Sequence, residues 1–116
     1  MNSTFDNTKP IYLQIVERLE SEIISGARSP GERIESVRDL ALRLKVNPNT
    51  VQRAFAELET EKLIETERTN GRYVTKNESK IKKLKEKFYK EKTKEYLNEM
   101  KKIGIEIIEI RRKNEN

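Results

Sequence analysis

A polar cluster opens a short amphipathic stretch near the middle of this chain. Its members are Asn49, Thr50, Gln52 and Arg53. The apolar residues between and after them recur at offsets of three, four and seven, the spacing of one helix face: Val51, Ala54, Phe55 and Leu58. On a helix the polar residues therefore face outward in the first turns. Amide and guanidinium groups bind base edges and phosphates, so the cluster indicates recognition of nucleic acid.

Two helices and a turn are predicted to position this cluster. Asn47 is a favourable N-cap and Pro48 suits the first helical position, which predicts a helix that runs to about Glu61. A preceding helix is predicted to begin at Ser36, which forms a capping-box pattern with Asp39. Its apolar stripe is Val37, Leu40, Ala41 and Leu44, and Lys45-Val46 would form the turn. This arrangement is typical of a helix-turn-helix domain, whose second helix enters the major groove.

The flanking segments predict a winged version of this domain. Residues 10–26 carry an apolar line at helical spacing, start with proline and end at Gly26, where a C-terminal cap is expected. Arg33-Ile34 is expected to pair as a short edge strand. Asn70-Gly71 lies between two β-prone runs, which is a strong hairpin signal. The fold class is therefore mainly α with a small β-hairpin: a winged helix-turn-helix domain followed by C-terminal dimerisation helices.

The last third of the chain has a different composition. From about Glu78 it is rich in lysine and lacks proline, and Gly104 is expected to end its long helix. A narrow apolar seam runs through it, so this helix must bury a stripe against a partner, and a second copy is the nearest candidate. We predict a homodimer joined through Ile81, Leu84, Phe88, Tyr96, Leu97, Met100, Ile103, Ile107 and Ile108. The expected domains are a flexible N-terminus at 1–9, the winged domain at 10–76 and a helical dimerisation tail at 77–116.

The net charge of +5 is unevenly distributed. Residues 1–75 hold 11 basic and 12 acidic side chains, whereas residues 76–116 hold 14 and 8. Residues 36–53, however, contain four basic side chains and a single acidic one, Asp39. This local excess would orient the domain toward phosphates. The tail lysines are read as a solvated helix face, with contact to flanking DNA as the alternative.

Several classes of protein are excluded by composition. The chain has no histidine or cysteine, which excludes a zinc site, a disulfide framework and a His-based catalytic relay. We expect no catalytic activity, no cofactor and no metal. No apolar run is long enough to span a membrane, and the N-terminus lacks a signal pattern, so a cytoplasmic location is expected. The sequence leaves open a small-molecule effector, and no residue locates a site for one.

The order of several short runs resembles the winged-helix domain of GntR-family bacterial transcription regulators. These runs are PIYLQI, SGARSPGERI, SVRDLA, NPNTVQRAF and the entry to the wing, EKLI, and the resemblance spans about residues 9–76. The short helical tail is similar to the YtrA-like subfamily. The resemblance implies a homodimeric repressor that binds a pseudo-palindromic operator, with transporter genes among its targets.

The resemblance also implies which residues contact DNA. Ser36 and Arg38 would do so at the start of the first helix of the motif, and Asn49, Thr50, Gln52 and Arg53 in the second. The wing tip would contribute Thr69, Asn70, Gly71 and Arg72. Two departures stand out: threonine replaces a common glycine at Thr69, and Ile34-Glu35-Ser36 replaces Leu-Pro-Ser. Glu35 thereby adds a negative charge near the expected phosphate-facing side.

Each assignment has a simpler structural alternative. Arg38 and Arg53 are also explained as solvated helix arginines, and Asn49 and Thr50 as helix-start residues. Gln52 suits adenine by bidentate pairing, with contact to phosphate alone as the alternative. A winged scaffold that binds another protein is the alternative function. The polar cluster argues against it, because protein-binding surfaces are richer in aromatic side chains.

Overall fold

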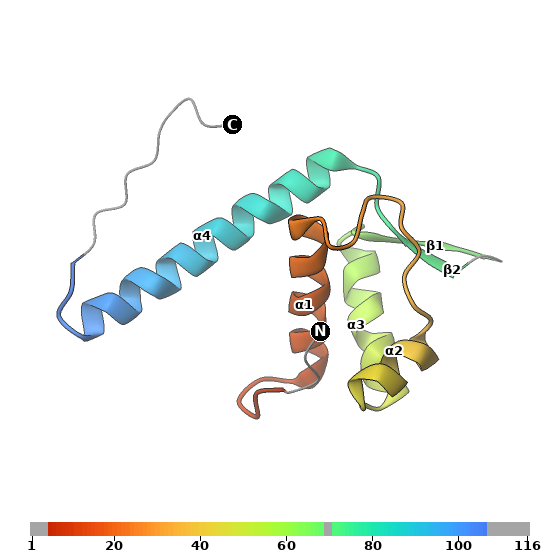
Figure 1. Ribbon diagram of the computed structural model, residues 1–116, viewed down its shortest axis with the longest axis horizontal. Coiled ribbons are helices and arrows are strands. Elements are labelled where there is room, and N and C mark those ends of the chain that lie inside the picture. The colour runs from red at the N-terminus through yellow and green to blue at the C-terminus, as the bar shows by residue number, and fades with distance from the viewer. Residues whose placement is uncertain (1–4, 69–70, 107–116) are drawn as a thin grey trace. The chain divides into compact units, whose positions relative to one another are not determined.

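The computed structural model describes residues 5–68 and 71–106 of the chain (Figure 1). The elements follow in the order α1 (Ile11–Ser25), α2 (Val37–Leu44), α3 (Pro48–Thr60), β1 (Ile64–Glu67), β2 (Gly71–Val74) and α4 (Glu78–Lys102). The predicted fold class is confirmed: the protein is mainly α, with a helix-turn-helix followed by a two-stranded wing. The helix predicted to run to about Glu61 ends at Thr60, with Glu61 as its C-cap.

Local sequence signals account for both ends of α1. Pro10 precedes its first residue, and its fixed φ of −55° leads into the helix. Gly26 ends the helix with a φ of 83°, in the left-handed region, and its N–H donates to the carbonyl of Ile23 at 3.3 Å. A residue with a Cβ is disfavoured in this conformation, which explains glycine at this position.

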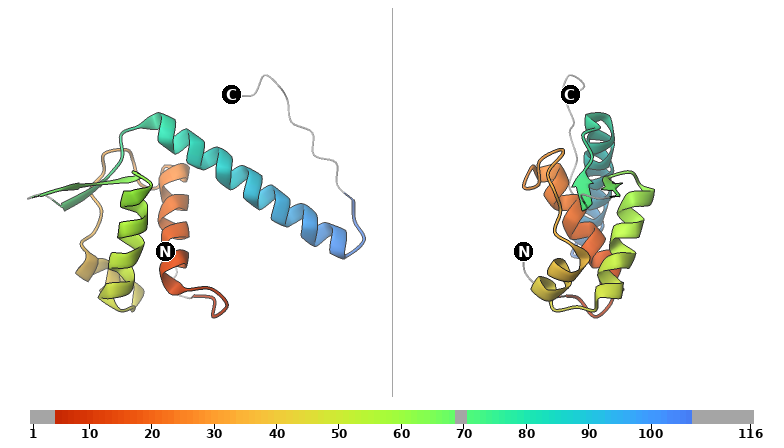
Figure 2. Two further views of the ribbon diagram at one scale, coloured as in Figure 1. Left: turned by 180° about the vertical axis from the view of Figure 1, so that it is seen from behind. Right: turned by 90° about the vertical axis from the view of Figure 1, so that its right-hand side faces the viewer.

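The three helices of the N-terminal unit share one apolar core. α1 packs against α3, and α2 packs against α3 (Figures 1 and 2). Each fully buried aliphatic or aromatic side chain contributes about 1.5–3 kcal/mol through the hydrophobic effect. The largest side chains with almost no exposed surface are Ile15 and Leu19 from α1, Leu40 and Leu44 from α2, and Val51, Phe55 and Leu58 from α3.

The wing is a two-stranded antiparallel hairpin, to which the segment before α2 adds an isolated β-bridge. Ile64 pairs with Val74 and Glu67 pairs with Gly71. As expected, the segment around Arg33 pairs with β2, through a bridge to Tyr73 and a 2.8 Å hydrogen bond from the N–H of Ile34 to the carbonyl oxygen of residue 72. This pairing connects the segment before α2 to the wing.

Residues 5–9, expected to be part of a flexible N-terminus, contact the first turn of α1. The side chain of Gln14 is buried, accepts a 2.8 Å hydrogen bond from the N–H of Asp6, and donates to the carbonyl oxygens of Asp6 at 2.6 Å and Lys9 at 3.0 Å. The guanidinium of Arg18 lies over the ring of Phe5, 4.2 Å from its centroid. These contacts hold the segment against the start of α1.

The chain divides into two compact units, Met1–Leu84 and Lys85–Asn116. The division falls within α4, so the first turns of this helix belong to the winged unit, and Leu84 is only 6% exposed. Gly104, expected to end the helix, has a φ of 80° two residues after its last position. Within the described residues, no helix combines the length and apolar character that a membrane span requires.

Candidate nucleic-acid interface

The start of α3 presents the polar cluster outward. The side chain of Asn47 accepts a 2.8 Å hydrogen bond from the N–H of Asn49, and Pro48 occupies the first turn, as predicted. Val51, Ala54, Phe55 and Leu58 are buried in the core, so the opposite face of α3 is turned outward. Asn49, Gln52 and Arg53 are exposed and Thr50 is half-buried.

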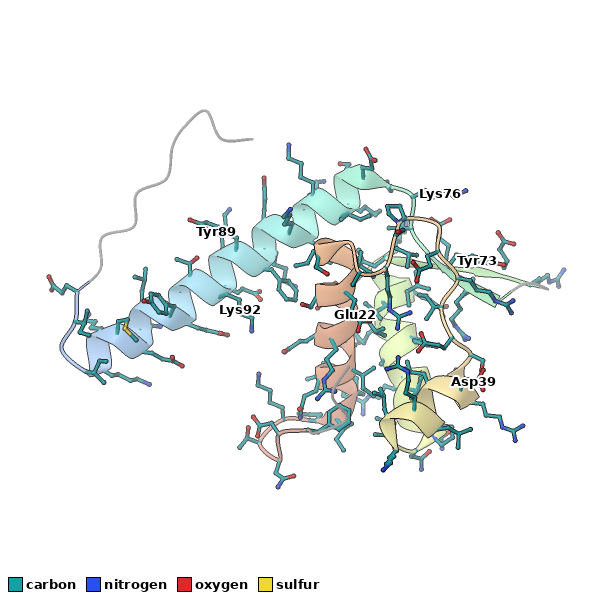
Figure 3. The ribbon with its side chains drawn as sticks, in the orientation of Figure 1. Glu22, Asp39, Tyr73, Lys76, Tyr89 and Lys92 are labelled. Carbon is teal, nitrogen blue, oxygen red and sulfur yellow. The ribbon has the colours of Figure 1, made fainter. Side chains whose placement is uncertain are left out.

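The start of α2 carries the second group of expected DNA contacts in the helix-turn-helix. Ser36 Oγ accepts a 3.1 Å hydrogen bond from the N–H of Asp39, labelled in Figure 3, as the capping pattern predicts. The hydroxyl of Ser36 keeps its own proton as a donor, because this bond uses the oxygen as an acceptor. Ser36 and Arg38 are both exposed. An exposed hydroxyl and guanidinium at a helix N-terminus suit a phosphate group.

The turn between α2 and α3 fixes their relative placement. Lys45 ends α2 in the left-handed region with a φ of 58°, and the N–H of Val46 donates to the carbonyl of Ala41 at 3.0 Å. These features are typical of a helix C-cap, although glycine is the usual residue there. The tight turn brings the start of α3 directly after the end of α2.

Arg53 packs against α1. Its Cζ atom lies 3.9 Å from the ring centroid of Tyr12, a cation–π arrangement. The half-buried ring of Tyr12 thus lies beside an exposed arginine of the polar cluster. No local sequence pattern predicts this pair, because the two residues lie on different helices.

The negative charge of Glu35 is balanced within the protein. One of its carboxylate oxygens lies 2.7 Å from Nη1 of Arg28, and the other accepts from Nε of Arg43 at 3.0 Å and also from Nη2 of that residue. Arg28 also binds Glu22, which Figure 3 labels, at 2.6 Å. Burial raises the pKa of the Glu35 carboxyl, but the hydrogen bonds from Arg28 and Arg43 outweigh it and lower the pKa to about 2. The carboxylate is therefore an internal ion-pair partner, rather than a free charge facing phosphate.

The wing contains two of the expected contact residues within the described chain. Gly71 begins β2, and Arg72 follows it. The Nε atom of Arg72 donates to Glu59 of α3 at 2.9 Å, and its guanidinium lies 5.0 Å from the ring centroid of Phe55. This arginine thus connects the wing to α3. Thr69 and Asn70 lie outside the described residues.

Ion pairing separates seven of the eight arginines among residues 5–68 and 71–106 into two groups. Arg28, Arg43 and Arg72 each have a carboxylate partner. Among residues 5–68 and 71–106, four other arginines have no carboxylate oxygen within 4.0 Å of their nitrogens: Arg33, Arg38, Arg53 and Arg68. Sequence reasoning did not select Arg33 as a contact residue. Its guanidinium lies against Gly71, where an added Cβ would be 3.4 Å from Nε.

Six of the expected dimerisation residues lie in α4, and Ile103 directly follows its last residue. Tyr96 and Ile103 are exposed, with exposed fractions of 52% and 67%. Leu84 is buried in the first unit. Four others are half-buried: Ile81, Phe88, Leu97 and Met100. Ile107 and Ile108 lie outside the described residues.

Comparison with known proteins places these features in a family. Residues 11–74, more than half of the chain, match the family described as "Bacterial regulatory proteins, gntR family". The chain is similar to the HTH-type transcriptional regulator YhcF of Bacillus subtilis, with 34% identity over 105 residues, which cover 90% of this chain and 87% of that protein. It is 42% identical to the HTH-type transcriptional repressor YtrA of the same organism over 71 residues, 61% of this chain and 55% of that protein.

Solved structures show the same architecture. A GntR family transcriptional regulator from Listeria monocytogenes aligns with a TM-score of 0.80 and 44% identity, over 87% of this chain and 89% of that one. The structure described as AraR(DBD) in complex with operator ORR3 aligns with a TM-score of 0.56 and 25% identity, over 65% of this chain and 88% of that one.

Proposed function

The chain belongs to the GntR family of bacterial DNA-binding transcription regulators, and on that premise we propose that it is a homodimeric repressor of a pseudo-palindromic operator. The observation that carries the proposal is the exposed face of the helix-turn-helix. Asn49, Gln52 and Arg53 are exposed at the start of α3, and Arg38 is exposed near the start of α2 without a carboxylate partner in the described chain.

The roles in this site follow from the chemistry of the side chains. Ser36 and Arg38 bind phosphates of one strand and set the register of the domain on DNA. Asn49, Thr50, Gln52 and Arg53 enter the major groove, where the amide and guanidinium groups read base edges. Gly71 and Arg72, with Thr69 and Asn70, form the wing contact. The repressor YtrA and the operator complex of AraR(DBD) support this reading by their descriptions.

The second unit supplies the dimer contact. Residues 85–102 of α4 are rich in charge, and their apolar side chains form a sparse stripe with no large core of its own. Such a helix is stabilised when its stripe is covered, and a second copy of the same helix covers it symmetrically. Two winged units joined in this way bind half-sites about one helical turn apart, on the order of 34–36 Å. Transporter genes are the proposed targets, as the YtrA-like resemblance implies.

The first experiment is a binding titration of the full-length protein with the duplex immediately upstream of its own gene. A scrambled duplex of equal composition serves as the control, at low and near-physiological salt. Preference for the native duplex that survives added salt supports sequence-specific regulation. Footprinting then measures the half-site spacing.

Equal binding of both duplexes that disappears with salt would indicate non-specific electrostatics at that site. Selection of duplexes from a random library then tests whether the operator lies elsewhere. Failure of the selection to enrich any sequence would contradict the proposal.

A further inference from the structure

Arg53 contacts the ring of Tyr12, as Arg18 contacts the ring of Phe5, but Arg53 belongs to the exposed polar cluster of α3. Arg28, Arg43 and Arg72 donate to carboxylates, which use their N–H groups. Arg53 instead places its Cζ atom over an aromatic ring, 3.9 Å from the ring centroid. The five N–H donors of a guanidinium lie in its plane, so stacking leaves them free for phosphate or for the O6 and N7 atoms of guanine.

The ring of Tyr12 is itself well placed to act as a rigid support. It lies in the first turn of α1, directly before residues that belong to the core, with Ile15 fully buried and Val16 only 6% exposed. The buried amide of Gln14 ties the same turn to the chain at Asp6 and Lys9. The backbone that carries the ring is thereby fixed on both sides.

We propose that Tyr12 is a positioning residue for DNA recognition, which holds Arg53 in its binding orientation through the aromatic ring. The inference rests on the proposed function, because it assigns to α1 a role in the same recognition surface. A free arginine side chain loses rotamer freedom when it binds, and stacking in the unbound protein removes part of that loss. α1 thus contributes to operator binding without contacting a base.

Three variants test separately the hydroxyl of Tyr12, its ring and the guanidinium of Arg53. Tyr12→Phe retains the ring and removes the hydroxyl, so it is the matched control. Tyr12→Leu removes the ring and keeps an apolar side chain of similar burial. Arg53→Ala removes the stacked group and serves as the background in which the ring has nothing to hold. Urea unfolding of each variant reports whether the fold is retained.

The experiment measures affinities for a duplex selected from a random library on the wild-type, full-length protein, against a scrambled duplex. We expect Tyr12→Leu to weaken binding about two- to fivefold, the size of an exposed cation–π contact. Tyr12→Phe should bind like the wild type. In the Arg53→Ala background, Tyr12→Leu should cause no further loss of affinity, because the ring then has no guanidinium to hold. A purely structural effect of Tyr12→Leu would persist in that background.

The outcomes distinguish this inference from the proposed function. A wild-type protein with no preference for any duplex contradicts the proposed function. If the wild type is selective and Tyr12→Leu binds equally well or better, only the positioning role is overturned. Equal losses in Tyr12→Phe and Tyr12→Leu also overturn it, since they assign the effect to the hydroxyl.

A measurement on the wild type tests the same inference without relying on a folded Tyr12→Leu variant. The ring current of Tyr12 should shift the side-chain proton resonances of Arg53 in NMR spectra. These shifts should be retained in Tyr12→Phe and preserved when the selected duplex is added to the wild type. Return of the Arg53 resonances to unshifted positions on adding DNA would show that binding breaks the stack, and would overturn the inference.

Discussion

The carboxylate of Glu35 lies 2.7 Å from the guanidinium of Arg28, between the end of α1 and the start of α2. The side chain of Arg28 is only 10% exposed and is also bound by Glu22 of α1. The other oxygen of Glu35 accepts from Arg43, at the end of α2. The ion pairs therefore connect α1 and α2 across the irregular segment that joins them, and so hold the helix-turn-helix on the rest of the winged unit.

Removal of the Glu35 charge should destabilise the protein. Glu35→Gln leaves the nearly buried Arg28 with one carboxylate in place of two, so we expect the free energy of unfolding to fall by about 1–3 kcal/mol. Urea unfolding followed by circular dichroism measures this loss. Glu57→Gln is the matched control, because Glu57 is exposed and has no ion pair among the described residues. Equal stability of the two variants would contradict the assigned role of Glu35.

The same carboxylate should make stability depend on pH in the acid range. The pKa of Glu35 in the folded protein is lowered to about 2 from its ordinary value of 4.5. A lowered folded-state pKa stabilises the protein at pH values above 4.5, and this contribution is lost as the pH falls from 4.5 toward 2. Allowing for solvent screening, we expect the loss to be about 1–2 kcal/mol.

Comparison of the wild type with Glu35→Gln isolates this contribution. Glutamine does not titrate, so the stability difference between the two proteins should be largest near neutral pH and should shrink below pH 4.5. Unfolding curves in urea at several pH values measure it. A difference that stays constant down to pH 2 would assign the acid sensitivity to other carboxylates.

Local signals in the sequence were sufficient to predict the helices and the hairpin. The cap at Asn47 with Pro48, the glycine at Gly26 and the Asn70-Gly71 hairpin signal each act within a few residues, so their consequences can be read along the chain. Helical periodicity also identified the buried face of α3, and its outward face followed by exclusion. The start of the wing and the exposure of the polar cluster were therefore predictable.

Side-chain contacts between helices could not be predicted from these local signals. The sequence predicts a free Glu35 charge near phosphate, because the partners of Glu35, Arg28 and Arg43, come close only in the folded protein. Tyr12 and Arg53 meet because α1 packs on α3, and no periodicity specifies which side chains then touch. Side-chain pairing across helices depends on tertiary geometry, which a single sequence does not encode in its local pattern.

The two roles assigned to Ser36 can be separated by substitution with aspartate. Aspartate caps helices as well as serine does, so Ser36→Asp should retain the stability that the bond to the N–H of Asp39 provides. Its carboxylate cannot donate to a phosphate and repels it. We expect unchanged urea unfolding and a loss of affinity for the selected duplex of about tenfold or more, the loss of one charge-assisted hydrogen bond. Full affinity in a stable Ser36→Asp protein would exclude Ser36 from the phosphate contacts.

The two arginines of the wing should respond differently to removal. Arg72 is bound to Glu59 and lies over Phe55, so Arg72→Ala should lower the free energy of unfolding by about 1 kcal/mol or more. Arg68 is exposed and has no ion pair among the described residues, so Arg68→Ala should leave stability within about 0.5 kcal/mol of the wild type. Thermal and urea unfolding measure both. Equal effects would show that the contacts of Arg72 with α3 contribute little.

Disruption of the apolar stripe of α4 should both dissociate the proposed homodimer and weaken operator binding. Truncation at the start of α4 would remove Leu84, which is buried in the first unit, so a substitution beyond it is the cleaner test. Leu97→Lys places a charge in the stripe and retains a good helix former. We expect a monomer in light scattering and a loss of affinity on the order of 100-fold, because two linked half-sites gain from effective concentration. Asn98→Lys adds the same charge at the neighbouring exposed position and should remain dimeric with full affinity. If Leu97→Lys stays dimeric as well, the copies meet through another surface.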